Sequence, residues 1–379
     1  AESVANYDGY GGIAVSAGVD EYFGVETYRS ALIDTQGNFI FPYADNLYPF
    51  TTFQYICSDG YALIDYGNDV ALDIGYLENP TYYNLDGTPA DIPLPDADKQ
   101  SFIESYNADG ARLSYTLHPF YDGVALVEVQ YDTVYLPDPN QTAGGGSGVG
   151  NAQMYMAYLI DTQGNVLATL GEDIYQPLFY MTASPYADIG AAGEGLVPYI
   201  FQEVNDVGFY ISRLGYLDYS GQLALDLTDT TYRDLGTFSE GLAWVVDDAA
   251  GKCGYIDKTG QLVIPLEYDT VYPFSDGMAV VRQGDKWGAI DQNNNVVIPF
   301  QYDGSFGGTD GYMTVQVNGK YGLVDKENQM VVPAEYDDIS TFENGAAYAL
   351  KDGYVHIITE GTAAPLAYAS TPTGTIDGA

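Results

Sequence analysis

The last third of the chain repeats itself every 34 residues. A signature of the form Lys-x-Gly-x-[Ile/Val]-Asp ends at Asp257, Asp291 and Asp325. The same step separates other landmarks, which are Pro265, Pro299 and Pro333, and the pairs Tyr268-Asp269, Tyr302-Asp303 and Tyr336-Asp337. A chain with so many positions in one register is restricted to a row of similar units, each of which buries its apolar residues against its neighbours.

Degenerate copies of the unit precede the regular ones. The signature ending, an aliphatic residue followed by Asp, recurs without the Trp at Asp34, Asp65, Asp161 and Asp218. The sequence therefore predicts about eight or nine units, which are regular in the last third and degenerate before it.

Each unit has the pattern of antiparallel strands. Residues 278–282 and 287–290 are short alternating runs separated by a turn. The third residue after the signature Asp is Gly or Asn, the two residues that adopt left-handed backbone at the lowest cost. This pattern predicts a type I turn capped by the Asp side chain, with a G1 bulge at the Gly or Asn. The Val-x-Pro run that follows is expected to be an edge strand, because Pro gives no N–H to a ladder.

The regularity of the units suggests where the chain divides. Residues 1–210 carry degenerate repeats, residues 211–359 carry regular repeats, and residues 360–379 are expected to be a loosely ordered tail. Two segments interrupt the first part. Residues 91–117 are predicted to be an insertion with a short helix over 99–106, and residues 137–153 a Gly-rich loop between the two strands of one hairpin, 124–130 and 154–160.

The regular unit resembles the WG-repeat, or KWG-type, family of bacterial β-repeat proteins. The resemblance is carried by Lys286-Trp287-Gly288, followed by Ile298-Pro299 and Tyr302-Asp303. It covers residues 210–358 clearly and residues 7–210 in degenerate form. The resemblance implies an all-β repeat array, usually on exported or surface proteins of bacteria, and brings no catalytic residues with it. The signature Trp occurs only at Trp287, and Cys253 and Tyr321 replace it in the neighbouring units.

The predicted fold is therefore an all-β array of about eight or nine antiparallel hairpin repeats. A unit of this length is short for a four-stranded blade, and both ends of the chain carry the same type of hairpin. These two features favour an open, curved or superhelical stack, with a ring like a β-propeller as the alternative.

Charge and hydropathy exclude several classes of partner. The chain has 12 Lys and Arg against 53 Asp and Glu, a formal net charge of −41. Nucleic-acid binding needs clustered cations, so it is excluded, and docking on an anionic membrane is disfavoured. The sequence has no apolar run long enough for a transmembrane helix. A start at Ala1, together with the acidity, leads us to expect an exported protein, extracellular or on the cell surface, whose signal peptide has been removed.

Metal and cofactor chemistry has few available ligands. The two His, His118 and His356, and the two Cys, Cys57 and Cys253, allow no His-rich metal site, no CxxC zinc site and one disulfide at most. We expect both His to be packing residues and no cofactor to be bound. Calcium remains possible at three acidic pairs, although the EF-hand pattern is absent. The pairs are Asp96 with Asp98, Asp226 with Asp229, and Asp247 with Asp248.

Carboxylates are the only abundant reactive groups, and two of them at a fixed separation could hydrolyse a glycoside. We assign Asp34, Asp161, Asp218, Asp257, Asp291 and Asp325 to the recurrent turn instead. Trp287, Tyr321 and Cys253 exchange at one repeat position, which suggests a buried stacking site.

The surplus of Tyr, 37 residues, is the best indication of binding. The candidate ligand-binding residues are Tyr268, Asp269, Tyr302, Asp303, Tyr336, Asp337 and Trp244. We expect a non-enzymatic extracellular repeat protein that offers an acidic, Tyr-rich surface to a protein or a glycan. The alternative is a carbohydrate-active hydrolase that uses paired carboxylates.

Overall fold

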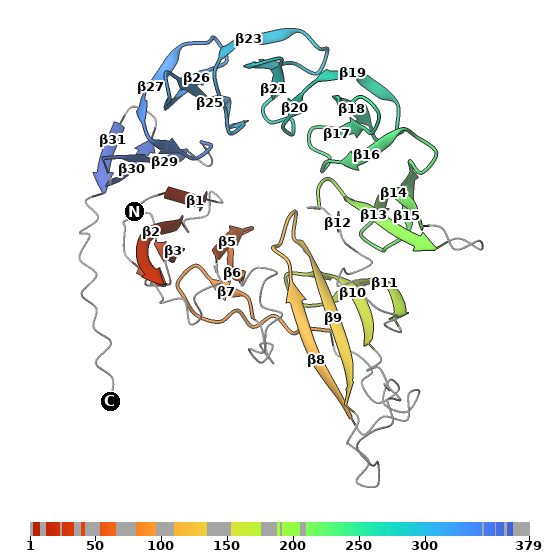
Figure 1. Cartoon of the computed structure of the whole chain (residues 1–379). Helices are drawn as coiled ribbons and strands as arrows, with labels where there is room; N and C mark the ends of the chain where they lie inside the picture. The colour runs from red at the N-terminus through yellow and green to blue at the C-terminus, as the bar shows by residue number, and fades with distance from the viewer. Residues whose placement is uncertain are drawn as a thin grey trace, which may run out of the picture. The chain divides into compact units, whose positions relative to one another are not determined.

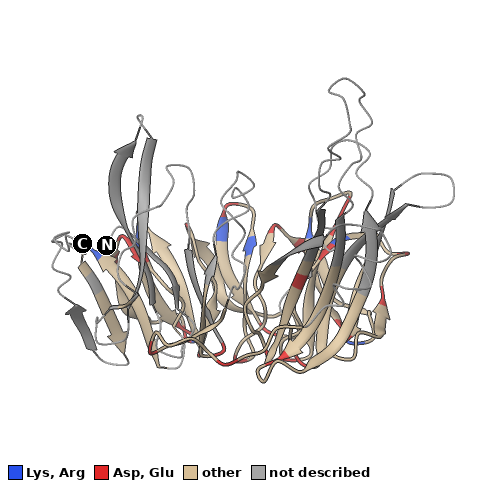
Figure 2. Ribbon diagram, turned by 90° about the horizontal axis from the view of Figure 1, so that it is seen from below, with Lys and Arg blue, Asp and Glu red and all other residues tan. Residues whose placement is uncertain are grey.

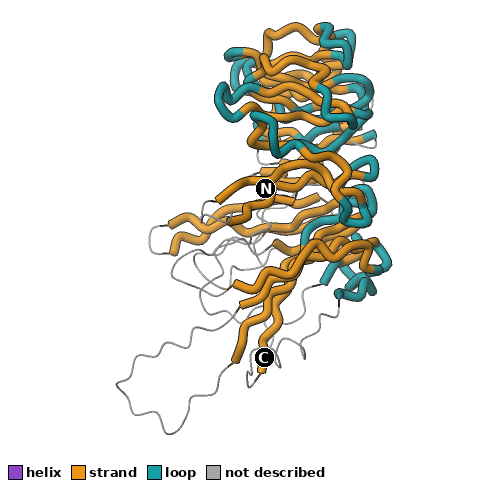
Figure 3. Tube along the Cα trace, turned by 90° about the vertical axis from the view of Figure 1, so that its right-hand side faces the viewer, coloured by secondary structure: helices purple, strands orange, loops and turns teal. Residues whose placement is uncertain are grey.

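The computed structural model describes most of the chain. The described residues are 3–7, 13–22, 25–33, 39–41, 54–65, 81–95, 110–134, 153–175, 188–189, 192–204, 210–342, 345–352, 354–359 and 362–366. All regular elements among them are β-strands (Figure 3). Over these described ranges, no helix has the length and hydrophobicity that crossing a membrane requires.

The strands form eight antiparallel sheets, seven with four strands and one with three (Figure 1). Chain neighbours pair within each sheet. The first half of the chain supplies β1 (Ser3–Tyr7) to β4 (Phe39–Phe41) through β2 (Ile13–Tyr22) and β3 (Val25–Ile33), then β5 (Gln54–Ser58), β6 (Tyr61–Asp65) and β7 (Tyr83–Asn84), then β8 (Gly110–Leu117), β9 (Val124–Val134), β10 (Gln153–Asp161) and β11 (Val166–Tyr175).

Five sheets follow the same plan downstream, of which the last three are the most regular. They comprise β12 (Asp188–Ile189), β13 (Leu196–Val204), β14 (Tyr210–Asp218) and β15 (Leu223–Asp226); β16 (Tyr232–Leu235), β17 (Leu242–Asp247), β18 (Cys253–Asp257) and β19 (Leu262–Tyr268); β20 (Thr270–Val271), β21 (Ala279–Gln283), β22 (Lys286–Ile290) and β23 (Val296–Tyr302); β24 (Gly308–Thr309), β25 (Tyr312–Val317), β26 (Lys320–Asp325) and β27 (Met330–Tyr336); β28 (Asp338–Ile339), β29 (Ala346–Lys351), β30 (Tyr354–Thr359) and β31 (Thr362–Leu366).

The all-β repeat array is thus confirmed, but each regular unit holds four strands rather than a hairpin alone. Four strands fit into 34 residues because the first strand of the unit, such as β20 or β24, is only two residues long. Our argument that the unit is too short for a four-stranded sheet was therefore wrong.

The chain divides into two compact units. The first unit consists of residues 1–71, 84–88 and 268–379, and the second of residues 72–83 and 89–267. Within the first unit, β1 lies beside β28 and β29, so strands from the two ends of the chain are neighbours. The grouping joins the degenerate first repeats to the regular last ones.

The cores lie between consecutive sheets. In the first unit, Val280 and Ile298 of one sheet pack against Met313 and Val315 of the next, and all four are fully buried. In the second unit, Leu214 and Tyr216 pack in the same way against the strands that follow. Burial of about 25 cal/mol for each Å² of apolar surface is what holds neighbouring sheets face to face.

The turn after the signature Asp has the predicted geometry. Asp291 accepts hydrogen bonds at Oδ1 from the backbone N–H groups of Asn293 (2.9 Å) and Asn295 (2.8 Å). Asn294 has a left-handed φ of 64°, and the ladder shifts register between Ala289 and Ile290. Equivalent turns are capped by Asp161, Asp218, Asp257 and Asp325. Asp34 lies outside the described residues.

The bulge explains the glycine of the signature. A Cβ atom on Gly288 would lie 2.6 Å from the backbone O of Ile298, and Gly254 and Gly322 face equivalent carbonyls at 2.4 Å. The last strand of each unit approaches so closely that only glycine fits. As predicted, the Pro-containing strands β19, β23 and β27 are each at the edge of their sheet.

The predicted insertions and tail are partly resolved by strands. Strands β9 and β10 pair along their length, which confirms the hairpin around the Gly-rich loop. Strand β8 occupies residues 110–117, so part of the first predicted insertion is a strand. Strand β31 occupies residues 362–366 of the predicted tail, because the last unit also completes its fourth strand. The expected helix at 99–106 and the Gly-rich loop itself lie outside the described residues.

Candidate functional site

The aspartates of the Tyr-Asp pairs join consecutive sheets. Asp303 accepts from Lys286 Nζ (2.7 Å) in its own unit and from the backbone N–H of Asn318 (3.4 Å) in the hairpin of the next. Asp269 accepts from the N–H of Gly284 (2.7 Å) in the same manner. The hydrogen bond from Lys286 lowers the pKa of the Asp303 carboxyl. These carboxylates therefore serve as clamps between a unit and its successor.

Asp337 repeats this arrangement at the last junction. It accepts from Lys320 Nζ and from the N–H of Asp352 (3.3 Å). The hydrogen bond from Lys320 lowers the pKa of Asp337. The Lys of the signature and the Asp of the Tyr-Asp pair, 17 residues apart, thus form one structural element.

The tyrosines of the same pairs are buried. Tyr268, Tyr302 and Tyr336 expose 3%, 7% and 3% of their surface. The hydroxyls of Tyr268 and Tyr302 donate to Oδ1 of Asn294 and Asn328, each over 2.7 Å. Each acceptor is the left-handed turn residue of the following unit. The expectation that these tyrosines face a ligand is not met, because their rings are enclosed between sheets.

Trp244 lies on β17, half-buried against the start of its own sheet. A Cβ atom on Gly236 would lie 2.2 Å from the indole Nε1, so the ring covers that glycine. The backbone O of Gly236 accepts from the Tyr216 hydroxyl (2.7 Å). Trp244 thus packs on the chain between β16 and β17.

The signature aromatic position is only partly buried. Cys253 is a buried free thiol, as expected for a residue that replaces a core aromatic. Trp287 and Tyr321 are instead half-buried, and each contacts an aromatic residue 15 positions earlier. The ring centroids of Trp287 and Tyr272 are 5.9 Å apart, and those of Tyr321 and Phe306 are 4.6 Å apart.

Tyr272 and Phe306 were missed in the sequence, although a signal existed. They are 34 residues apart, so they occupy one repeat position, and each precedes a signature aromatic by the same distance. Phe306 exposes 42% of its surface, more than any other described Phe or Trp. These are the aromatic rings that the regular units present to solvent.

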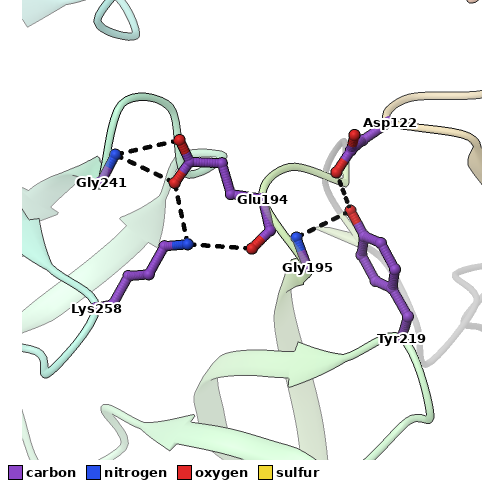
Figure 4. A network of polar contacts seen from close by, with 6 residues as sticks. All are labelled: Asp122, Glu194, Gly195, Tyr219, Gly241 and Lys258. Atoms are coloured by element: carbon purple, nitrogen blue, oxygen red, sulfur yellow. Dashed lines mark hydrogen bonds and ion pairs between the residues drawn. The ribbon is translucent and has the colours of Figure 1, made fainter.

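A second polar network links the tight turns of the second unit (Figure 4). Glu194 pairs with Lys258 (3.1 Å) and accepts from the N–H of Gly241 (3.1 Å to Oε2). The hydroxyl of Tyr219 donates to Asp122 (2.6 Å) and accepts from the N–H of Gly195 (3.2 Å). The acidic residues of these turns therefore have structural contacts. Figure 2 shows how often Asp and Glu lie at such strand ends.

The two histidines have packing contacts. His118 Nε2 lies 3.2 Å from Glu128 Oε2, and the backbone O of His118 accepts from the Tyr82 hydroxyl (2.7 Å). His356 contacts the Tyr336 ring edge to face, with 5.5 Å between centroids.

The acidic pairs considered for calcium are engaged where they are described. Asp226 accepts from the N–H of Thr228 (2.9 Å), and Asp247 accepts from the Thr231 hydroxyl (2.6 Å). In the part of the chain that the structure describes, no three His, Cys, Asp or Glu side chains form a cluster that could hold a metal ion. Asp96 and Asp98 lie outside that part.

Comparison with known proteins identifies the regular units. Residues 254–287, 287–321 and 321–354 match the family model of the WG containing repeat, so the chain carries three consecutive WG repeats. No curated protein matches the sequence.

Solved structures are similar only at low scores. Prolyl oligopeptidase B from Galerina marginata has a TM-score of 0.41 and 10% identity over 80% of this chain, which spans 47% of that one. The β-propeller domain of the Trilobed protease from Pyrococcus furiosus, described as having an open velcro topology, has a TM-score of 0.38 and 9% identity over 98% of both chains. AztD from Citrobacter koseri has a TM-score of 0.34 and 9% identity over 81% of this chain and 91% of that one.

Proposed function

We propose that this protein is a non-enzymatic repeat protein of the bacterial cell exterior that binds a protein or a glycan. The observation that carries the proposal is that the recurrent polar side chains hold the scaffold. Turn aspartates such as Asp291 cap backbone amides, aspartates such as Asp303 clamp the next hairpin, and Tyr302 bonds to Asn328 in the following unit. A scaffold held in this way leaves function to the exposed side chains that differ between units.

The state of the carboxylates supports binding over hydrolysis. A glycosidase needs a carboxyl group whose pKa is raised, so that it can protonate the leaving group. Hydrogen bonds to the charged form lower the pKa of several aspartates here, which are Asp86, Asp161, Asp218, Asp247, Asp257, Asp291, Asp303 and Asp337. A carboxylate that stays ionised suits a structural acceptor better than a general acid.

The location of the protein is part of the proposal. It is supported by the WG repeats, whose family is usual on exported bacterial proteins, and by the net charge of −41. Protease treatment of intact producing cells tests it. We expect the chain to be cleaved in intact cells or recovered from the medium, and protection until the cells are lysed would contradict an exterior location.

Arrays of glycans and of extracellular proteins test the binding function. The labelled chain should bind members of one array, and the same glycans incubated with unlabelled chain should gain no reducing ends. Turnover of any glycan would replace the proposal by the hydrolase with paired carboxylates. Absence of binding on both arrays would refute a binding function.

A further inference from the structure

Four aromatic residues of the first unit form a continuous strip across two consecutive sheets. We define the aromatic strip as Trp287, Tyr272, Phe306 and Tyr321. Trp287 contacts Tyr272 at one end, and Phe306 stacks on Tyr321 at the other, with 26° between the ring planes. The four residues come from the β20–β23 and β24–β27 segments of the repeat.

Gly307 joins the two pairs. It follows Phe306 in the chain, and a Cβ atom on it would lie 3.2 Å from Cδ1 of Tyr272. Its φ of 107° is in the range that glycine adopts without strain. Tyr272 of one pair therefore rests on the backbone that carries Phe306 of the other, and the strip has no break between the sheets.

Polar groups border the strip. The guanidinium carbon of Arg282 lies 5.9 Å from the centroid of the Trp287 ring, and its Nε donates to Thr270 (3.1 Å). Guanidinium has five N–H donors, so others are available. On the second sheet, Gln316 is half-buried opposite Tyr321, and its side chain lies beside Gly304. The strip thus combines flat apolar rings with side-chain donors and an amide.

The charges around the strip are balanced. Lys286 and Lys320, which precede Trp287 and Tyr321, are paired with Asp303 and Asp337. An anionic ligand would meet a chain of net charge −41 without free cations at these positions. A neutral ligand pays neither penalty, so charge complementarity favours a neutral one.

We propose that the aromatic strip binds a neutral oligosaccharide. A sugar ring offers an apolar C–H face that stacks on an aromatic ring, and hydroxyls at its rim that accept from Arg282 and bond to Gln316. Rings repeated along an extended chain suit a ligand whose own rings repeat. The inference rests on the binding function proposed above and names the site and the ligand class for it.

Tryptophan fluorescence tests the proposal directly, because the chain has only two Trp. The substitution Trp244→Phe leaves Trp287, at the end of the strip, as the sole reporter. This full-length chain is titrated with three probes, cellohexaose, maltohexaose and mannohexaose. We expect at least one of them to change the emission of Trp287 saturably.

Two strip variants and one control locate the site. Phe306→Ala should weaken binding by about 3- to 10-fold, since an aromatic stacking contact is worth that much. Gln316→Ala should also weaken it, and Phe306→Tyr should retain it. Tyr354→Ala is the control, because Tyr354 is 48% exposed in the same unit but lies outside the strip. It should leave affinity unchanged. Equal thermal unfolding of the exposed-residue variants establishes that they fold.

The outcomes separate this proposal from the function it rests on. Hexasaccharide binding that Phe306→Ala leaves unaltered overturns the strip as the site, while a binding function stands. Failure of all three probes, with a polypeptide bound on the protein array, overturns the neutral oligosaccharide and again leaves binding standing. Failure of the probes and of both arrays overturns both.

Discussion

The hydrogen bond between Tyr302 and Asn328 offers the sharpest test of how the units are held together. The phenol donates over 2.7 Å to a side chain in the turn of the following unit. We consider the substitutions Tyr302→Phe and Asn328→Gly, singly and together. Each removes one partner, and Gly also suits the left-handed φ of 59° at residue 328.

The expected magnitudes follow from the burial of the two groups. Tyr302 is 7% exposed and Phe fills the same volume, so its substitution removes the hydrogen bond and little packing. A net loss of about 0.5 to 1.5 kcal/mol in the free energy of unfolding follows. Asn328→Gly loses the same bond but relieves the left-handed backbone, so its cost is smaller. The double variant should be less unstable than the sum of the two, with a coupling energy of about 0.5 to 1.5 kcal/mol.

Urea denaturation of the four proteins, followed by tryptophan fluorescence, measures this coupling. Tyr336→Phe is the matched control. Tyr336 is as deeply buried at the equivalent position, but among the described residues no side chain accepts from its hydroxyl. It should cost less than Tyr302→Phe. A coupling energy below about 0.3 kcal/mol, the usual error of additivity, would refute the view that this bond joins the units.

Three further predictions concern the bulge, the turns and calcium. Gly288→Ala places a Cβ atom 2.6 Å from the backbone O of Ile298, and we expect a loss of about 1 to 3 kcal/mol in urea denaturation; an unchanged midpoint would contradict the close approach. The turn aspartates have a lowered pKa when folded, so they stabilise the fold above the unfolded pKa near 4 and lose this effect as pH falls through the folded pKa. Tm should thus decrease below about pH 4, and a rise there would have the wrong sign. Calcium or a chelator should leave Tm unchanged, because the Asp226 and Asp247 carboxylates are already hydrogen-bonded; a clear increase with calcium would instead indicate a site.

The features that the sequence predicted are those that a few adjacent residues determine. Asp291 and Asn294 lie within one turn, and the cap and the bulge need nothing else from the fold. Pro299 marks an edge strand because it has no N–H. The hairpin between β9 and β10 was likewise predictable in spite of the long loop, since two alternating strands flank it.

The features that the sequence did not reveal depend on residues in different units. Strand β20 has only two residues, too few for a period, so the fourth strand of the unit was invisible. The burial of Tyr302 depends on Asn328, 26 residues away. A comparison between repeats contains that information. Where the turn residue is Gly260, with no side chain to accept a hydrogen bond, the position of the Tyr is taken by Asp234.

The same comparison explains why the aromatic strip is confined to two sheets. At the preceding unit, the residue equivalent to Tyr272 is Phe238, which is buried at 1% exposure and contacts Tyr216. Its partner at the signature position is Cys253, so a small side chain accompanies an inward ring. At Phe306 the ring is exposed and the signature residue is aromatic. Packing has settled this pair of positions in one unit and has left it on the surface in the next two, where a ligand can select the side chains.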